Sequence, residues 1–206
     1  LFSANTPNGK KISIMLEEIG YEYKVTKIDL DKGEQFNLDF KKISPFGKIP
    51  AIIDHESNKS VFESGAILFY LAEKSGKFYN SEDRLEINQW LMAQMGYIGP
   101  MLGQHHQFHH YNPGKSKFGE ERYFKISKSI YQDLDQRLAK SNYLSGDEYS
   151  ISDIATFPWI ARHEWHDIGL SKFNNLTRWY KEISKREAVI RGFSFMKKNE
   201  HPQNLS

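Results

Sequence analysis

The sequence lacks cysteine entirely, with none among its 206 residues. This absence excludes disulfide bonds, thiolate metal ligands and a cysteine nucleophile supplied by the chain itself. Long apolar runs are missing as well, because no stretch approaches the about 20 residues that a membrane-spanning helix needs. If a site in this protein performs thiol chemistry, the sulfur must arrive with the ligand.

A strong excess of either charge is also absent. The 28 basic and 26 acidic residues leave a formal net charge of +2, which gives no electrostatic argument for a nucleic-acid or membrane partner. What is present is an ordinary globular composition, 39% hydrophobic and 14% aromatic. The chain opens at Leu1-Phe2-Ser3 within a strand pattern, so we expect a few residues to precede it. A soluble cytoplasmic protein is the default expectation.

The first part of the chain alternates between strand and helix patterns. Apolar residues recur at helical spacing from Ile12 to Ile19, and Gly20 then ends the helix. The other predicted elements are a strand remnant at 1–2, a strand at 21–28, a partly helical connection at 35–43, strands at 49–53 and 59–62, and a helix at 64–74. This order predicts an α/β domain over residues 1–76, with helices packed on a small mixed sheet.

Strand patterns disappear from Asp83 onward, and the polar segment 75–82 is interpreted as a linker. The later patterns predict an all-α domain over residues 83–196, with helices near 84–102, 117–138, 150–167 and 174–185. Ser150 and Asp153 match a capping box, a pair that starts a helix by reciprocal hydrogen bonds. The polar tail 197–206 is expected to fray.

The first functional motif is Thr6-Pro7-Asn8-Gly9. Thr6 suits the N-cap of a helix and Pro7 its first position, so the N–H groups of the first turn can face a ligand. A helix N-terminus stabilises an anion such as a thiolate, and Asn8 can donate its side-chain amide to the sulfur. The alternative interpretation is that the tetrapeptide only starts a helix.

Two further motifs fit a small peptide ligand. A cis Ile49–Pro50 bond would turn the Ile49 N–H and C=O outward, where an extended peptide can pair with them as an added strand. The alternative is an ordinary trans proline. Ser64 opens a helix whose hydroxyl and N–H groups can receive a carboxylate, and Glu63 can accept an ammonium group. The alternative here is an N-cap beside a first-turn acid.

In this order, Thr6-Pro7-Asn8-Gly9, Lys48-Ile49-Pro50-Ala51 and Phe62-Glu63-Ser64-Gly65 resemble the glutathione S-transferase superfamily. That superfamily combines a thioredoxin-like domain with an all-helical domain. Within the superfamily, further stretches resemble the bacterial Nu class, which is related to the yeast nitrogen-regulating prion protein. These stretches are Lys32-Gly33-Glu34-Gln35-Phe36, Ala66-Ile67 and Gly99-Pro100-Met101-Leu102-Gly103-Gln104. The resemblance covers essentially the whole chain and implies the fold of that superfamily.

The resemblance also implies which residues contact glutathione. Asn8 and Thr6 match the catalytic positions that face the glutathione sulfur. The other implied contacts are the Ile49 backbone clamp beside cis-Pro50, the γ-glutamyl ligands Glu63 and Ser64, the carboxyl-end contacts Gln35 and Lys48, and Arg122 for a second glutathione.

The implied activity is the reduction of disulfide bonds with glutathione as co-substrate, in reduced or oxidised form. Some members of the class also reduce organic hydroperoxides. Two bound glutathiones let one thiolate attack a disulfide and the other resolve it, so the missing cysteine is no obstacle. We expect a cytoplasmic homodimer that acts on small thiols and disulfides, with weak conjugation activity. The alternative is a non-enzymatic glutathione-binding regulatory or interaction module.

His105-His106 and His109-His110 repeat at a spacing that would pair them on a helix and invite a metal. We expect no metal, because Pro100 and Gly103 disturb the predicted helix and no acidic residue is adjacent. The preferred interpretation is a polar, aromatic-rich rim over the acceptor site. Phe46 either inserts into a partner subunit or packs on its own loop.

Overall fold

The computed structural model describes residues 1–202, and their contacts divide the chain into two units. The first unit comprises Leu1–Tyr79 together with Lys185–Pro202, and the second comprises Asn80–Ser184. Residues 185–202 therefore belong to the first unit, whereas the sequence pattern assigned residues 83–196 to the helical domain. The apolar pattern of the short helix at 187–193 does not indicate which of the two cores it packs against. Residues 203–206 of the predicted tail lie outside the described part.

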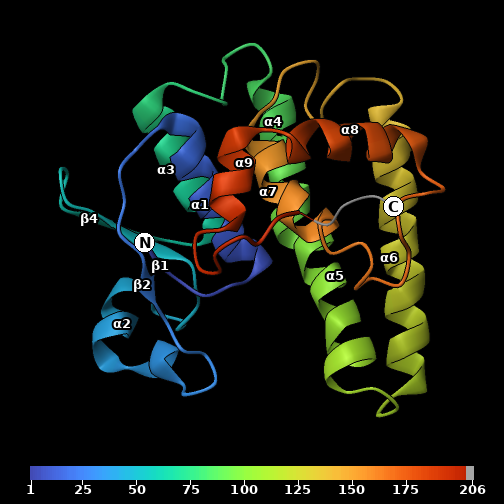
Figure 1. Ribbon diagram of the computed structural model, residues 1–206, viewed down its shortest axis with the longest axis horizontal. Helices are drawn as coiled ribbons and strands as arrows, with labels where there is room; N and C mark the ends of the chain where they lie inside the picture. The colour runs from blue at the N-terminus through green and yellow to red at the C-terminus, as the bar shows by residue number, and fades with distance from the viewer. Residues whose placement is uncertain (203–206) are drawn as a thin grey trace. The chain divides into compact units, whose positions relative to one another are not determined.

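The first unit contains a mixed sheet, as predicted (Figure 1). Its strands are β1 (Phe2–Ser3), β2 (Thr26–Lys27), β3 (Ala51–Asp54) and β4 (Lys59–Phe62), in the spatial order β2-β1-β3-β4. β1 runs parallel to β2 and antiparallel to β3, and β3 runs antiparallel to β4. β2 is shorter than the alternation over 21–28 predicted, because its partner β1 offers only two residues to pair with.

The helices of the first unit are α1 (Pro7–Ile19), η1 (Glu34–Phe36), α2 (Leu38–Ile43), α3 (Ser64–Ser75) and α9 (Glu187–Phe193). α1 is buried on most sides because it packs against both α3 and α9 (Figure 1). The approach to α9 is close: a Cβ added at Gly192 would lie 2.7 Å from the Ile14 Cα. Ser13 Oγ donates to the Gly192 carbonyl over 2.7 Å. α9 is therefore part of the support of α1.

The described elements of the second unit are all helical. They are α4 (Arg84–Ala93), η2 (Gln94–Ile98), α5 (Gly99–His106), η3 (Gln107–Tyr111), α6 (Lys117–Leu138), α7 (Ile151–Ile160) and α8 (Asn174–Ser184). The run from α4 to η3 is unbroken, with η2 and η3 as π-helical turns, although we expected it to end near residue 102. Pro100 lies in the first turn of α5, just after a π-helical turn, where its missing N–H is tolerated. Within the described residues, no helix combines the length and the apolar character that crossing a membrane requires.

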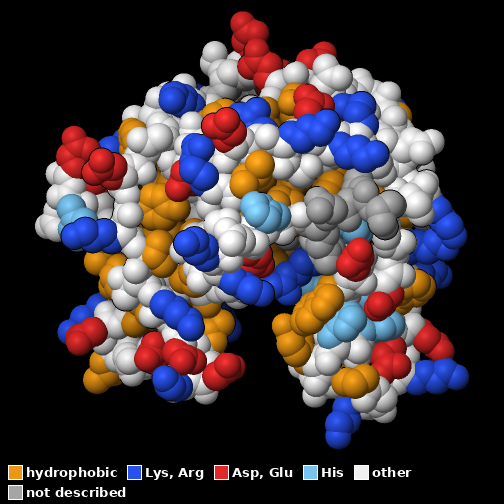
Figure 2. All heavy atoms as spheres, in the orientation of Figure 1, with side chains coloured by type: hydrophobic (Ala, Val, Ile, Leu, Met, Phe, Trp, Pro, Cys, Tyr) orange, Lys and Arg blue, Asp and Glu red, His pale blue; other side chains and the backbone are white. Residues whose placement is uncertain are grey.

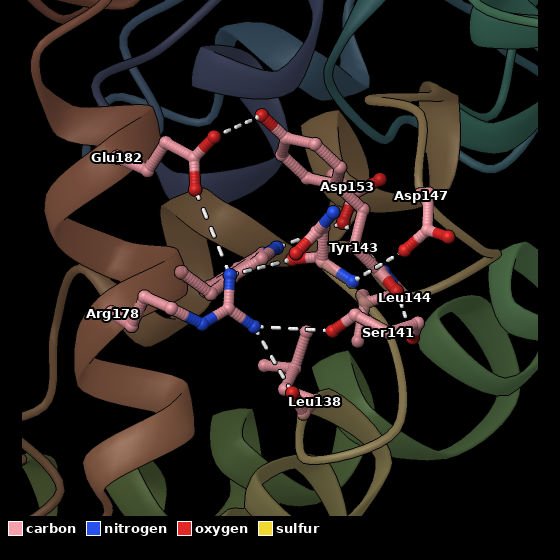
Figure 3. A network of polar contacts seen from close by, with 10 residues as sticks. Leu138, Ser141, Tyr143, Leu144, Asp147, Asp153, Arg178 and Glu182 are labelled. Atoms are coloured by element: carbon pink, nitrogen blue, oxygen red, sulfur yellow. Dashed lines mark hydrogen bonds and ion pairs between the residues drawn. The ribbon is translucent and has the colours of Figure 1, made fainter.

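The loop between α6 and α7 is held by polar contacts from α7 and α8 (Figure 3). Arg178 of α8 donates to the Leu138 carbonyl over 3.0 Å. Asp153 of α7 accepts a hydrogen bond from the Leu144 N–H at 3.0 Å. The capping box predicted for Ser150 and Asp153 is present, with both reciprocal bonds. One pair of residues thus starts α7 and also holds the preceding loop.

Candidate functional site

The three motifs flank one edge of the sheet in the first unit. The strand register places Phe2, Ala51 and Phe62 side by side across β1, β3 and β4. β1 and β4 end at this edge, and the chain continues from β1 into α1 and from β4 into α3. β3 begins at the same edge, directly after the Ile49–Pro50 bond. Motifs that are far apart in the sequence are therefore neighbours: Thr6, Asn8, Ile49, Pro50, Glu63 and Ser64.

The N-terminus of α1 has the predicted cap. Thr6 Oγ1 accepts a hydrogen bond from the Gly9 N–H at 3.1 Å, and this bond leaves the hydroxyl hydrogen available for donation to a ligand. Asn8 lies in the first turn and is partly buried. A Cβ added at Gly9 would lie 2.4 Å from Ser3 Oγ, and Ser3 is fully buried. Asn8 and Thr6 are thus more accessible to a ligand than the hydroxyl of Ser3 at the end of β1.

Lys11 is a buried lysine that the sequence analysis did not single out. Its side chain is 1% exposed, and its Nζ donates to Ser64 Oγ over 3.4 Å. Burial lowers the pKa of the Lys11 amine well below its usual range, and the nearby Glu63 carboxylate opposes this shift. The only signal for its burial is helical spacing, which places it one turn before the buried Met15. Lys11 links α1 to the start of α3.

Glu63 precedes α3 in an uncommon backbone conformation, with φ 68° and ψ 120°. A side chain disfavours this region, and such strain costs about 1–3 kcal/mol and gathers at functional sites. Glu63 is exposed, whereas Ser64 next to it is buried. An exposed carboxylate thus adjoins a helix N-terminus, so the pair can receive an ammonium group and a carboxylate.

The Ile49–Pro50 peptide bond is cis, as predicted. The loop before it is held by Ser44, a buried residue to which sequence reasoning gave no role. The Ser44 hydroxyl donates to the Lys48 carbonyl over 2.7 Å and accepts from the Lys48 N–H at 3.1 Å. One side chain therefore holds the backbone immediately before Ile49, while the Lys48 side chain extends into solvent.

Gln35 lies beside the same loop. A Cβ added at Gly47, where φ is +60°, would lie 2.6 Å from the Gln35 carbonyl oxygen. The Gln35 amide donates to the Leu30 carbonyl over 3.4 Å. Its buried Oε1 has no hydrogen-bond partner among the described residues. This packing brings Gln35 near Lys48 and leaves an acceptor that a ligand N–H can satisfy.

Arg122 belongs to a different unit from the other predicted contact residues. It is exposed on α6 in the second unit, whereas the other eight residues belong to the first unit. A hollow of about 960 Å³ in the first unit is not part of the candidate site, because none of the predicted contact residues lines it. At that hollow, the Lys74 ammonium holds the pKa of the Asp54 carboxyl well below its usual range.

Known families match both parts of the chain. The glutathione S-transferase N-terminal domain matches residues 1–73, and the glutathione S-transferase C-terminal domain matches residues 110–187. The chain belongs to the glutathione S-transferase family. The thioredoxin-like plus all-helical architecture expected for this transferase is thereby confirmed.

Relatives of the transferase include a named disulfide reductase and two solved structures with bound ligand. The disulfide-bond oxidoreductase YfcG of Escherichia coli (strain K12) is 44% identical over 196 residues, which cover 92% of this chain and 91% of YfcG. A glutathione transferase from Burkholderia graminis, with two glutathione molecules bound per subunit, is 40% identical with a TM-score of 0.88, covering 96% of this chain and 88% of that one. One from Pseudomonas putida, with one glutathione disulfide bound per subunit, is 39% identical with a TM-score of 0.87, covering 95% and 90%.

The second unit of the transferase gathers histidines from two segments, 105–110 and 163–166. Figure 2 shows histidine side chains (pale blue) close together on one face, beside acidic and apolar groups. Both reasons for expecting no metal here are wrong: the helical run continues through Gly103, and Asp167 Oδ2 lies 3.2 Å from His105 Nε2. The acidic neighbour was missed because it lies 62 residues away along the chain. The rim over the acceptor site stays a prediction.

Proposed function

We propose that this transferase reduces disulfide bonds with glutathione as co-substrate, with hydroperoxide reduction and weak conjugation as side activities. The observation that carries the proposal is that three motifs meet at one sheet edge in a chain without cysteine. Three relatives support the proposal. One is named a disulfide-bond oxidoreductase, one was solved with two glutathione molecules bound per subunit, and one was solved with a glutathione disulfide bound.

In this proposal, one glutathione lies along the sheet edge at which β3 begins. Its γ-glutamyl ammonium group pairs with Glu63, and the γ-glutamyl carboxylate is held by Ser64 at the N-terminus of α3. The backbone of Ile49, beside cis-Pro50, pairs with the cysteinyl unit as an added strand. Contacts to the carboxyl-bearing ends are assigned to Gln35 and Lys48.

The glutathione sulfur then faces the N-terminus of α1. The positive end of this helix favours the thiolate over the thiol, and the Asn8 amide and Thr6 hydroxyl donate to it. The thiolate attacks one sulfur of the substrate disulfide, which forms a mixed disulfide and releases one substrate thiolate. A second glutathione thiolate attacks the glutathione sulfur of that mixed disulfide, giving glutathione disulfide and the second substrate thiol. Both electrons come from glutathione, so the protein supplies only orientation and electrostatic stabilisation.

Arg122 is proposed to hold the second glutathione through a carboxylate, because a guanidinium binds carboxylates in bidentate geometry. Its exposed position on α6 leaves the side chain accessible.

The direct test is Asn8→Ala in a glutathione-coupled reduction of 2-hydroxyethyl disulfide. Loss of a donor to a developing or bound anion costs about 10- to 1,000-fold in rate, so we expect the kcat/KM of the variant to fall by at least about tenfold. The matched control is Asn142→Ala, an exposed asparagine of the second unit, which should retain wild-type activity.

Other outcomes separate the alternatives. Unchanged disulfide reduction in Asn8→Ala would remove Asn8 from the catalytic positions. A wild-type protein that binds glutathione without turning over any disulfide would support a regulatory or interaction module. A conjugation rate with chlorodinitrobenzene above the disulfide reduction rate would indicate an ordinary conjugating transferase.

We further propose that the enzyme is a homodimer. The support is Phe46, which is 71% exposed in the loop between α2 and β3. A ring exposed to this extent does not pack on its own loop, so insertion into a partner subunit is the interpretation that gives it a contact.

The location proposed for the enzyme is the cytoplasm. Glutathione reduces disulfides only where the glutathione pool itself is kept reduced, which is the condition of the cytosol. Fractionation of the native cells, with the enzyme activity recovered outside the cytosolic fraction, would contradict this location.

A further inference from the structure

The histidines at the end of α5 and in η3 meet one carboxylate from a distant segment of the same unit. Asp167 Oδ2 lies 3.2 Å from His105 Nε2 and 3.8 Å from His109 Nδ1. Asp167 follows α7 in a left-handed backbone conformation, with φ 56°. The three ligand atoms all lie within 4.8 Å of one another. We call His105, His109 and Asp167 the histidine–aspartate cluster.

The hydrogen bond on the far side of the His109 ring defines the chemistry of the cluster. His109 Nε2 lies 3.0 Å from the Glu120 carbonyl oxygen. A carbonyl only accepts, so Nε2 carries the proton and the lone pair of a neutral His109 lies on Nδ1. That lone pair then lies beside the Asp167 carboxylate, which is also an acceptor. Two facing acceptors need either an added proton or a cation between them.

His105 lies deeper in the unit than His109. It is fully buried, and its Nε2 lies nearest to the carboxylate of Asp167. A neutral imidazole carries one proton on either of its two nitrogens, so Nε2 presents a lone pair to a cation when the proton lies on Nδ1. The buried Nδ1 of His105 has no hydrogen-bond partner among the described residues.

We propose that His105 Nε2, His109 Nδ1 and Asp167 Oδ2 form a binding site for a divalent transition-metal ion such as Zn²⁺. Two imidazoles and one carboxylate are a donor set that suits such ions. The bond from His109 to the Glu120 carbonyl is the outer contact that commonly orients a metal-binding histidine. Water completes the coordination, because Asp167 and His109 are partly open to solvent.

The distances require only a local adjustment. With metal–ligand bonds of about 2.0–2.2 Å, tetrahedral ligand atoms lie ~3.3 Å apart, close to the 3.2 Å between His105 and Asp167. The His105 and His109 rings are stacked, with centroids 4.1 Å apart and planes at 12°. Two parallel rings cannot both direct an in-plane lone pair at one ion, so the His109 ring must tilt on binding while its Nε2 stays at the Glu120 carbonyl. His109 is the less buried of the two and has the room to do so.

Other groups beside the cluster do not compete for the ion. His110 Nε2 lies 3.6 Å from Asp167 Oδ2 but is already paired with the Trp165 carbonyl. His106 stacks on His166 with ring centroids 4.6 Å apart. These rings form an aromatic wall around the cluster, while Arg162 lies over the Trp165 ring.

The test is calorimetric titration of Zn²⁺ into the full chain, free of any histidine tag and previously treated with a chelator. We expect one ion per chain in the wild type. Asp167→Asn keeps the side-chain shape and tolerates the left-handed backbone, and His109→Gln keeps a donor for the Glu120 carbonyl. Each variant should weaken binding by at least about tenfold, whereas His55→Gln, at an exposed histidine in the turn after β3, should bind as the wild type does.

Cobalt substitution supplies a readout that does not depend on enzyme activity. Co²⁺ bound by the cluster should give visible d–d absorption in the wild type and in His55→Gln, and lose it in Asp167→Asn. Wild-type protein that binds Zn²⁺ only at about millimolar concentration or weaker would overturn the proposal. Variants at Asp167 and His109 that bind as tightly as the wild type would overturn it as well, because the ion would then lie elsewhere.

Discussion

Gly9 shows how one residue can determine whether the N-terminus of α1 reaches the site. Its missing side chain allows the first turn of the helix to lie against the end of β1, where an added Cβ would be 2.4 Å from Ser3 Oγ and 2.5 Å from the Ala4 carbonyl oxygen. Neither atom can withdraw easily, because Ser3 is fully buried and the carbonyl belongs to the backbone. The same N–H group of Gly9 donates to Thr6. Gly9 thus allows α1 to lie close to the end of β1, and its N–H group also completes the N-cap with Thr6.

Gly9→Ala is expected to lower the free energy of unfolding by about 1–3 kcal/mol, the usual cost of overpacking a tight site. The matched control is Gly96→Ala in the second unit, where an added Cβ meets no atom within 4 Å. This control should be neutral or slightly stabilising, by up to about 1 kcal/mol, because alanine favours helix over glycine. Urea denaturation followed by far-ultraviolet circular dichroism measures both. Equal stability of the two variants would contradict the close approach.

At the scale of elements, α7 shows how one helix start can organise a whole loop. Asp153 is fully buried, and burial raises its pKa to about 6. Its carboxylate accepts from the Leu144 N–H, from the Ser150 N–H at 3.1 Å and from the Trp179 indole at 2.8 Å. These donors come from the loop, from the helix start and from α8. Removing the acceptor therefore leaves buried donors in three segments without a partner.

Asp153→Ala is accordingly expected to cost about 3 kcal/mol of unfolding free energy or more at pH 7.5, since each buried unsatisfied donor costs about 1–3 kcal/mol. Tryptophan fluorescence is the suitable probe, because all four tryptophans lie within residues 80–184, the unit that contains Asp153. The exposed Asp133 on α6 supplies the control: Asp133→Ala should change stability by less than about 0.5 kcal/mol. Similar losses in both variants would show that Asp153 holds no special position.

At the scale of the whole molecule, the first unit combines residues 1–79 with residues 185–202, near the end of the described chain. Arg186, just before α9, forms a bidentate ion pair with Glu18 of α1 at 2.6 and 2.8 Å. Glu200 accepts hydrogen bonds from Lys10 and from the Asn5 amide, so part of the predicted frayed tail is held against α1. The support of the helix that carries Asn8 therefore comes partly from the last residues of the described chain.

The proposed homodimer is tested at this scale through Phe46. Sedimentation of the wild type should give twice the subunit mass of 24.1 kDa. Phe46→Ala should weaken the dimer by at least about tenfold, the effect expected when an aromatic anchor leaves an interface. Phe118→Ala is the matched control, since Phe118 is 74% exposed against 71% for Phe46. A dimer dissociation constant that is unchanged in Phe46→Ala would remove this residue from the interface.

Local patterns were sufficient to predict much of the molecule. The N-cap at Thr6, the helix end at Gly20, the capping box at Ser150 and the span of α6 all depend on residues within one or two helical turns of each other, and they are confirmed. The order of the three motifs along the chain was likewise enough to indicate the family, because this order can be recognised without knowing how far apart the motifs lie in space. The errors occurred where partners decide the outcome, as in the short β2 and the continuous run from α4 to η3.

What the sequence by itself determined is therefore the set of elements, the types of residue in each motif and the exclusion of a protein thiol. Only the tertiary structure decided which of these residues meet. The strand register brings residues 6–8, 49–50 and 63–64 to one edge, helix packing buries Lys11 beneath Ser64, and Asp167 is carried to His105 from 62 positions away. The physical reason is that helix and turn signals act over a few residues, whereas contacts between distant segments depend on how whole elements pack. The missing cysteine could be interpreted from the sequence alone. The place where the sulfur of a ligand would lie could be proposed only from the structure.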